Sequence, residues 1–249
     1  MLIALFVLLA IVAEIIGTVG GFGSSLFFVP VAQFFFDMKT VLGITAVFHV
    51  FSNLVKLILF RKTIDLRLTL LFGIPSILFV ILGAWLATKM SFRFDQIILA
   101  VFLIVFSSIL LAFPDLKVRA NAQSSVLGGS VAGLLAGYIG TGGAIRGLSL
   151  AAYNLEKNLF VGTSAAIDMG VDLSRSIIYV KSGFITKENY YLIPMLVVVS
   201  VVGSYIGKLL LGRINQESFR KIVLSLILII GIVMLIRSAI PFVNAQSFS

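Results

Sequence analysis

The chain has 249 residues, of which 60% are hydrophobic and 12% are charged, and it contains no cysteine. Soluble domains carry about 25% charged residues, so this composition excludes an ordinary soluble protein, and the lack of cysteine excludes a disulfide framework. The net charge of +9 would suggest a nucleic-acid partner in a soluble protein, but the basic residues lie at the ends of apolar runs, where they set topology. We therefore expect a membrane protein that contacts the lipid bilayer and binds no nucleic acid.

Apolar runs of about 17–25 residues can cross the bilayer core as helices, and the sequence contains several of them. The first run, Leu2–Ile16, is interrupted by glycines at Gly17–Gly23 and continues in a shorter apolar segment, Ser24–Phe36. A second glycine cluster, Gly137–Gly143, precedes another short segment, Ala144–Tyr153. The full spans that we predict are, in chain order, Thr40–Phe60, Leu66–Thr88, Asp95–Phe113, Leu159–Val180, Tyr190–Leu211 and Phe219–Ile240. The predicted fold class is an all-α integral membrane protein.

The two halves of the chain resemble each other. A shift of 120 residues places Gly17, Gly20 and Gly23 on Gly137, Gly140 and Gly143, and a shift of 119 places Asn53 on Asp172 and Lys56 on Arg175. Because matched polar residues inside apolar spans are difficult to obtain by chance, we predict two homologous membrane repeats. The repeats cover residues 1–113 and 124–241, joined by a connector at 114–123 and followed by a C-terminal tail at 242–249.

The path of the glycine-broken segments decides how these repeats are oriented. If each broken segment crosses the membrane, the repeats are parallel; if each is a re-entrant helix pair, each half has three transmembrane helices and the repeats are inverted. Leu2–Ile16 would be about 22 Å long at 1.5 Å per residue, which is short for a crossing.

The distribution of basic residues agrees with the inverted arrangement, which places ten on one side of the membrane and six on the other, as the positive-inside rule expects. The ten are Arg61, Lys62, Arg67, Lys117, Arg119, Lys157, Lys208, Arg213, Arg220 and Lys221, and the six are Lys39, Lys89, Arg93, Lys181, Lys187 and Arg237. We favour inverted repeats, with the connector in the cytoplasm and both termini outside.

The glycine clusters are the first candidate site. Broken helices are tolerated in a membrane where they are buried or line a wet cavity, and matched breaks in two repeats indicate a transport site. A helix that restarts after glycine presents free N–H groups and its positive dipole end, which both favour an anion. The alternative is that these glycines only allow close helix packing. The candidate substrate-binding residues are Gly20, Gly21, Gly23, Ser24, Ser25, Gly140, Thr141, Gly142 and Gly143.

Polar residues inside the third segment of each half are the second candidate. His49, Asn53 and Lys56 lie at spacings of four and three, which places them on one helix face, and Asp168, Asp172 and Arg175 repeat that spacing. Ionisable groups inside a span usually face the bundle interior or a water path. We expect Asn53, Lys56 and Arg175 to contact the substrate. The alternatives are that Asp172 and Arg175 only pair with each other and that Lys56 extends to the interface.

Two further charged residues belong to the candidate site. Arg146 follows the second glycine cluster, where its paired donors could hold a sulfonate, carboxylate or phosphate. Glu14 precedes the first cluster and could be a buried partner of a cation, a proton carrier or an interfacial residue. The candidates for carrying a coupled proton are Glu14, His49, Asp168 and Asp172. The spans contain no His/Glu metal cluster or serine–base pair, so we expect no enzyme, no metal and no cofactor.

These motifs resemble the TauE/SafE family of sulfite exporters and related anion permeases. The resemblance lies in Gly17–Ser25 with Val29–Pro30, in Gly140–Gly147, and in Thr163–Ala166 followed by Asp172–Arg175 and Tyr179. It implies transport of sulfite or organosulfur anions across the bacterial inner membrane, with the proton as a candidate coupling ion. The chain departs from the family pattern at Ser24 and Ser25, which replace glycine, and at Leu148–Leu150, which lacks the proline that matches Pro30.

The residues and the resemblance together predict a secondary transporter of a small anion, most simply sulfite or an organosulfur anion, that works by alternating access between the repeats. Its predicted partners are the anion and the lipid bilayer, and the sequence is compatible with a homo-oligomer. The alternatives are an anion channel and a non-transporting membrane subunit. A carrier should show saturable exchange, whereas a channel should show large flux that saturates poorly.

Overall fold

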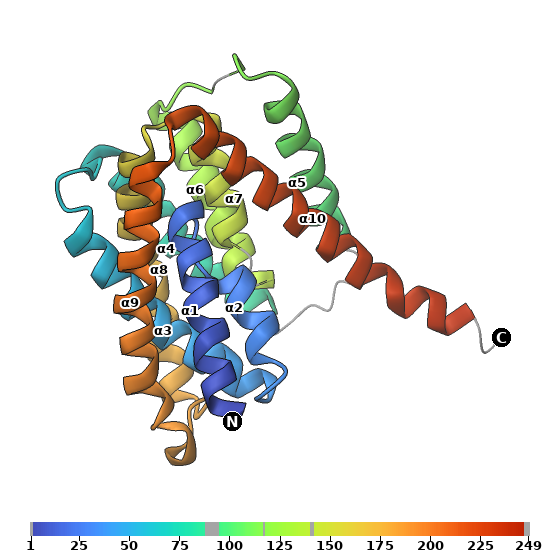
Figure 1. Cartoon of the computed structure of the whole chain (residues 1–249). Helices are drawn as coiled ribbons and strands as arrows, with labels where there is room; N and C mark the ends of the chain where they lie inside the picture. The colour runs from blue at the N-terminus through green and yellow to red at the C-terminus, as the bar shows by residue number, and fades with distance from the viewer. Residues whose placement is uncertain (1, 88–94, 117, 140–141, 247–249) are drawn as a thin grey trace.

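The computed structural model describes residues 2–87, 95–116, 118–139 and 142–246, and these residues form helices and turns with no strand (Figure 1). The helices are α1 (Leu2–Gly20), α2 (Ser25–Ala32), α3 (Met38–Leu59), α4 (Leu66–Ala87), α5 (Asp95–Ala112), α6 (Ala122–Ile139), α7 (Gly142–Ala152), α8 (Lys157–Lys181), the short 3-10 helix η1 (Lys187–Asn189), α9 (Leu192–Arg213) and α10 (Gln216–Gln246). The prediction of an all-α chain is confirmed.

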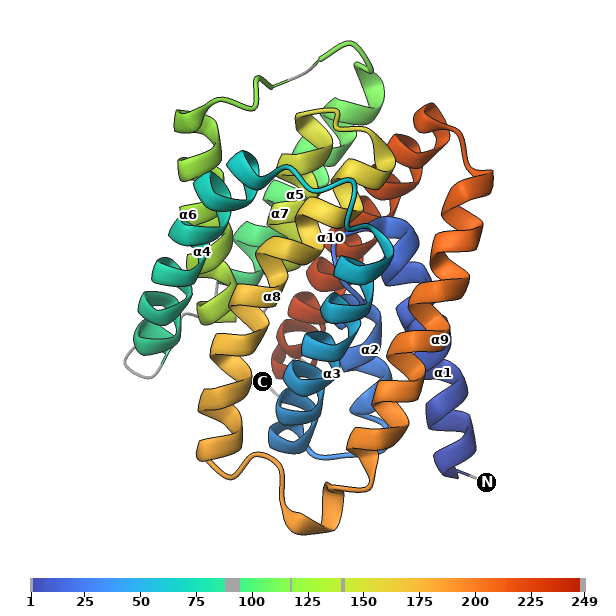
Figure 2. The ribbon, with the colours of Figure 1, turned by 90° about the vertical axis from the view of Figure 1, so that its left-hand side faces the viewer.

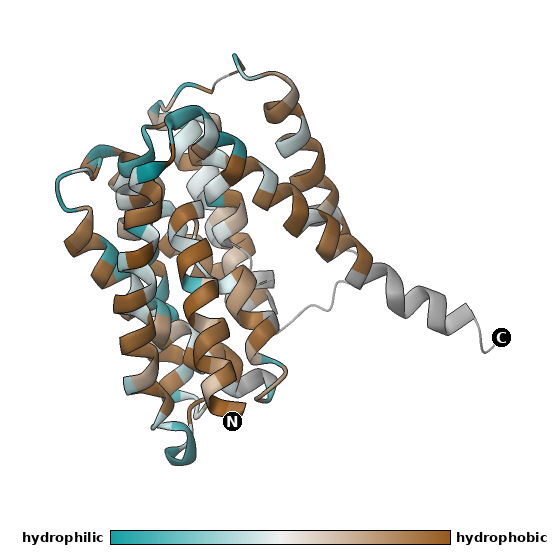
Figure 3. Cartoon of the chain, viewed as in Figure 1, coloured by the Kyte–Doolittle hydropathy of each residue, from teal (hydrophilic) through white to brown (hydrophobic). Residues whose placement is uncertain are grey.

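Within the described residues, five segments are long and apolar enough to cross a membrane: Leu2–Gly20, Thr40–Leu59, Leu66–Gly83, Lys187–Arg213 and Gln216–Ile236. Figure 3 shows hydrophobic residues along the sides of the bundle and hydrophilic residues gathered at its two ends. This distribution is that of a multi-pass membrane protein, as the composition predicts. α8 has 25 residues, enough for a crossing, but its polar residues keep it out of the apolar set.

The glycine breaks are narrower than the sequence predicts. α1 continues through Gly17 to Gly20 and has 19 residues, so it is roughly 28 Å long and the predicted length of about 22 Å is wrong. Gly17 does not break the helix because its role is close contact: a Cβ on Gly17 would lie 2.5 Å from the Cα of Ser24. In the second half α6 likewise passes Gly137 and ends at Ile139.

The directions of the helices follow a regular scheme. Figures 1 and 2 show α1 rising from the lower end of the bundle, where the amino terminus lies, and α2 returning toward that end. α6 instead descends from the upper end, next to the connector after α5, and α7 returns to the upper end. The helices α3, α4 and α5 run up, down and up, whereas α8, α9 and α10 run down, up and down.

Helices that occupy the same position in the two halves of the chain pack against corresponding partners. α1 packs against α9 and α6 packs against α4, while α3 packs against α8 and α5 against α10. α3 and α8 therefore lie side by side at the centre of the bundle (Figure 2). This arrangement brings together the two helices that carry the matched polar residues.

Small residues allow these helices to approach closely. A Cβ on Gly129 of α6 would lie 2.2 Å from the backbone oxygen of Phe72 on α4, and a Cβ on Gly133 would lie 2.2 Å from that of Ser76. The Ser76 hydroxyl donates a hydrogen bond across the contact to the Gly129 oxygen (3.0 Å). The Gly-x-x-x-Gly spacing thus joins α6 to α4 through backbone contact, as small residues do in membranes.

The corresponding contact of α1 with α9 places a charged residue in the interior. A Cβ on Gly203 of α9 would lie 2.7 Å from the Cβ of Glu14, and a Cβ on Gly207 would lie 2.6 Å from that of Thr18. Glu14 is consequently held between α1 and α9, with 0% of its surface exposed. The alternative of an interfacial Glu14 is therefore wrong.

We expect Gly133→Ala to lower the midpoint of thermal unfolding in detergent. The added methyl group would meet the backbone of Ser76, which cannot yield as a side-chain end can, and overpacking of this kind costs about 1–3 kcal/mol. Gly212→Ala is the control, because no atom lies within 4 Å of a Cβ at that helical position. Equal midpoints for the two variants would contradict the close contact of α4 and α6.

Candidate functional site

The break between α1 and α2 turns on two glycines in left-handed conformations. Gly21 has φ of +72° and Gly23 has φ of +93°, which L-residues with side chains adopt only with strain. The N–H of Gly21 still bonds the oxygen of Gly17 (2.9 Å), so the helix ends here. The chain then turns through Phe22, which is buried, into Ser24 and the start of α2.

Gly23 lies at the meeting point of three helices. A Cβ on this residue would lie 3.6 Å from Asp168, 3.8 Å from His49 and 4.0 Å from Arg146. These side chains come from α8, α3 and α7, which belong to both halves of the chain. The first glycine break therefore reaches the polar residues that the sequence singles out on the later helices.

Glu14 and Lys56 form the first buried ion pair. The Lys56 ammonium lies 2.8 Å from Glu14 Oε1, and Lys56 is only 3% exposed. Four hydroxyl groups also donate to the Glu14 carboxylate, from Thr18 (3.2 Å), Ser24 (2.6 Å), Ser52 (2.6 Å) and Ser204 (2.8 Å). The alternative that Lys56 extends to the interface is wrong, because its charge is neutralised inside the bundle.

Arg146 and Asp168 form the second ion pair. Both terminal nitrogens of Arg146 bond the Asp168 carboxylate, and its Nε donates to the hydroxyl of Ser164 (2.9 Å). One terminal nitrogen also donates to the backbone oxygen of Phe22 (2.9 Å), which the glycine break exposes. Arg146 thus connects α7, α8 and the first break, and the break satisfies part of its hydrogen-bonding capacity.

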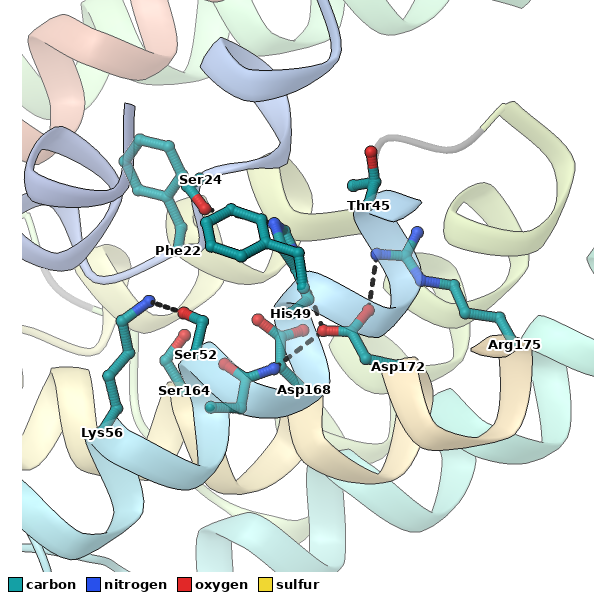
Figure 4. A network of polar contacts seen from close by, with 12 residues as sticks. Phe22, Ser24, Thr45, His49, Ser52, Lys56, Ser164, Asp168, Asp172 and Arg175 are labelled. Atoms are coloured by element: carbon teal, nitrogen blue, oxygen red, sulfur yellow. Dashed lines mark hydrogen bonds and ion pairs between the residues drawn. The ribbon is translucent and has the colours of Figure 1, made fainter. Parts of the chain in front are cut away.

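Asp172 and Arg175 form the third ion pair (Figure 4). A terminal nitrogen of Arg175 lies 2.5 Å from Asp172 Oδ1, while Asn53 donates to Asp172 Oδ2 (2.8 Å). The predicted pairing of Asp172 with Arg175 within α8 is therefore present. The hydrogen bond from Asn53 also links Asp172 to α3. The pairing leaves Arg175 incompletely satisfied, because its Nε is buried without a hydrogen-bond partner.

His49 lies between the first and third pairs. The single hydrogen of the Ser24 hydroxyl is donated to Glu14 at 2.6 Å, so its oxygen accepts from His49 Nε2 at 3.2 Å. In the neutral ring Nδ1 then carries no hydrogen, and it faces Asp172 Oδ2 at 3.5 Å. Two acceptors face each other at this contact, and a proton on Nδ1 would convert it into a charge-assisted hydrogen bond.

A small, partly open cavity adjoins the second and third pairs. Its polar wall consists of Ser25, His49, Ser76, Arg146, Asp168, Asp172 and Arg175, and its apolar wall includes Phe72, Ile167 and Val171. The free space is about 30 Å³, which accommodates about two or three water molecules, since roughly 10–15 Å³ holds one. Two guanidinium groups thus share a cavity that must widen before it can hold an anion.

The predicted site residues are distributed over this region as follows. Gly23, Ser24, Ser25, Asn53, Gly143, Arg146, Arg175 and the four proton-coupling candidates lie on or next to the cavity and its ion pairs. Gly20 and Gly21 instead pack against the rings of Phe22 and Phe160, Gly142 begins α7, and Lys56 does not line the cavity. Gly140 and Thr141 lie outside the described residues.

Sequence reasoning missed the hydroxyl partners of the ion pairs other than Ser24. Ser52 donates to Glu14 and accepts from Lys56 (2.8 Å), Ser204 donates to Glu14, and Ser164 accepts from Arg146. Ser52 could have been found, because it follows His49 by three residues and precedes Lys56 by four on the same helix face. Ser204 carries no such signal. Among the described residues, no group of three His, Cys, Asp or Glu side chains could hold a metal ion.

Apolar helices that bury three ion pairs beside a broken helix define a multi-pass membrane protein whose interior is built to hold charge. The sequence matches the family described as sulfite exporter TauE/SafE over residues 6–234. The chain therefore belongs to the TauE/SafE family of membrane transporters, which confirms the resemblance found at the glycine clusters. A comparison with curated proteins found no significant match.

We expect Glu14→Gln to lower the free energy of unfolding by about 3–5 kcal/mol, because it leaves the Lys56 ammonium buried without a carboxylate. Glutamine keeps the size and can still accept hydroxyl hydrogens, so the loss reports the charge. The double variant Glu14→Gln with Lys56→Met removes both charges and should recover most of the stability. Denaturation of the purified protein measures both effects, and a single variant as stable as the wild type would contradict the pairing.

Proposed function

We propose that the chain is a secondary transporter that moves a small anion, sulfite or an organosulfur anion, across the bacterial inner membrane by alternating access, together with a proton. The family match supports a membrane transporter of this kind. The cavity between Arg146 and Arg175 is the observation that carries the proposal, since it brings two guanidinium groups together at a small hollow among the helices.

The N–H donors of Arg146 and Arg175 that have no protein partner indicate which of the two arginines is available to the substrate. Arg146 bonds Asp168, Ser164 and a backbone oxygen, so its donors are largely occupied. Arg175 bonds Asp172 through one terminal nitrogen, and its buried Nε has no partner. With 18% of its side chain exposed, Arg175 is also the most accessible of the three cations in the ion pairs. An oxyanion entering the cavity would therefore meet Arg175 first.

Charge balance is the argument for a coupled proton. Lys56, Arg146 and Arg175 are matched by three carboxylates, so the group is neutral when His49 is counted as neutral. An anion that entered this interior alone would add one uncompensated buried charge, which costs several kcal/mol. A proton that enters with a monovalent anion removes that cost.

His49 is the group that we assign to this proton. Its Nδ1 faces the Asp172 carboxylate, so protonation would replace a contact between two acceptors by an ion pair. Glu14 suits the role less well, because an ammonium and four hydroxyls already satisfy it.

The charged groups around His49 fit this assignment. Asp168, Asp172 and Arg175 face it from α8 and Arg146 from α7, and Glu14 reaches it through Ser24. α2 carries no charged residue. The basic residues of α9, Lys208 and Arg213, lie near the C-terminal end of that helix. Asp172 is the partner that a protonated His49 would gain directly.

Alternating access is supported by the arrangement of the helices. The pairs α1–α2 and α6–α7 open toward opposite ends of the bundle, and their inner ends approach the cavity (Figure 2). The opposite directions of the two pairs are those expected of inverted repeats, with the substrate held where the two pairs meet. We infer that one half rocks against the other, so that the cavity opens to one side and then to the other.

In proteoliposomes, we expect saturable uptake of labelled sulfite that a pH gradient drives and that Arg175→Gln abolishes. To separate anion binding from folding, Arg175→Gln is combined with Asp172→Asn, which keeps the interior neutral. This double variant should fold and yet lose at least 90% of the uptake, because the charged guanidinium group that would bind the anion is gone. Arg175→Lys should retain part of the uptake, since the positive charge remains but the paired N–H donors of the guanidinium group are lost.

Arg213→Gln is the matched control, because this exposed arginine near the end of α9 should leave uptake unchanged. Uptake by the double variant within twofold of the wild type would remove Arg175 from the site. Large uptake that does not saturate would favour a channel. No uptake of any tested anion by the folded wild type would favour a non-transporting subunit.

A further inference from the structure

A second, larger cavity lies at the upper end of the bundle, away from the three ion pairs. It is an open hollow of about 620 Å³ between the end of α3, the following turn, the start of α8 and α9. Its basic lining residues are Arg61, Lys62 and Lys208, and no acidic residue lines it. This volume lies within the range of roughly 300–1,000 Å³ that is usual for ligand pockets.

The turn that forms the cavity is held firmly by the neighbouring helix. The Thr63 hydroxyl shares its single hydrogen between the backbone oxygens of Phe60 (3.0 Å) and Asn158 (3.2 Å), both of which lie within hydrogen-bonding distance. A Cβ on Gly162 of α8 would lie 2.4 Å from the Thr63 oxygen, so α8 and the turn are in backbone contact. Arg61 and Lys62 are thus presented from a fixed turn.

The three cations lack acidic partners in the described part of the chain. None of them has a described carboxylate within ion-pairing distance. Two acidic side chains of neighbouring segments are engaged as helix caps: Asp65 accepts from the N–H of Leu68 at the start of α4, and Glu156 accepts from the N–H groups of Asn158 and Leu159 at the start of α8. Lys208 donates to the Leu59 oxygen (2.8 Å) and lies 5.5 Å from the Phe60 ring centre.

The cavity lies where an apolar span ends and the basic residues begin. The span Thr40–Leu59 supplies its apolar wall, including Ile58, which is 62% exposed, and Arg61 follows directly. Figure 3 shows the hydrophilic residues gathered at this end of the bundle. A ligand here would meet hydrocarbon on one side and positive charge on the other. Phospholipid headgroups occupy this level of a bilayer, and basic pockets between helices bind anionic ones.

We propose that this cavity is a binding site for the phosphate headgroup of an anionic phospholipid, with its acyl chains along Ile58. Arg61 and Lys62 bind the phosphate oxygens, and Lys208 adds charge from α9. The lipid would join α3, α8 and α9 at one end of the bundle without contacting the ion pairs. The site is therefore independent of the proposed transport function.

Native mass spectrometry of the purified protein, with phosphatidylglycerol added to phosphatidylcholine nanodiscs, tests this proposal. We expect one tightly held phosphatidylglycerol, with its affinity lowered roughly fivefold for each cation removed in Arg61→Gln and Lys62→Gln, since each basic residue near the surface contributes about 1 kcal/mol. These two exposed residues make no described contact that the fold needs, so their loss should not unfold the protein. Arg67→Gln and Arg213→Gln, which lie outside the cavity, are the controls.

Three results would overturn the proposal. Equal affinity in the Arg61 and Lys62 variants would exclude the cavity, and an equal loss in the Arg67 and Arg213 controls would show unspecific attraction to a basic surface. Displacement of the lipid by millimolar inorganic phosphate would show a site for free oxyanions and not for a lipid. Because the readout is bound lipid, the outcome does not depend on whether the protein transports sulfite.

Discussion

Taking a charged side chain out of water into an apolar interior is expensive, and this cost governs the arrangement of the whole bundle. In the part of the chain that the structure describes, the three buried ion pairs place six charged side chains among the helices, and each cation lies next to a carboxylate. The pairs are not self-sufficient, since hydroxyl groups, an amide and a backbone oxygen complete their hydrogen bonds. Removal of one member of any pair would leave a buried charge without compensation.

The break between α1 and α2 and the close-contact glycines also serve to supply hydrogen-bond partners to the buried charges. The turn at Gly21 and Gly23 exposes the oxygen of Phe22 to Arg146 and aims the Ser24 hydroxyl at Glu14 instead of using it to cap α2. The contact of Gly203 with Glu14 brings α9 close enough for Ser204 to reach the carboxylate. Polar groups in the first half thus depend on elements of the second, so a movement of one half against the other must change the ion pairs.

The sequence was sufficient to predict most helices and the pairing of Asp172 with Arg175 inside α8, but not the contacts between polar residues of different helices. The apolar runs located α3 and α4 within two residues, because their ends are marked by charged residues and turns. Spacings of three and four predicted that His49, Asn53 and Lys56 share a face, since helical periodicity is a local property. The pairing of Lys56 with Glu14 joins two helices separated in sequence, and no local pattern contains it. The sequence predicts that the first helix breaks at Gly17, whereas it continues to Gly20. A glycine that allows close contact, such as Gly17, cannot be distinguished in sequence from one that ends a helix.

The claim that one proton accompanies each monovalent anion is tested most directly by driving sulfite uptake with voltage at constant pH. An imposed potential of 100 mV corresponds to about 2.3 kcal/mol per elementary charge, which would change the accumulation of an anion moving alone by roughly 50-fold. If His49 carries a proton with the anion, wild-type accumulation should stay within twofold at any potential, and His49→Gln should no longer accumulate sulfite in response to a pH gradient. Accumulation by the wild type that follows the voltage would contradict the account.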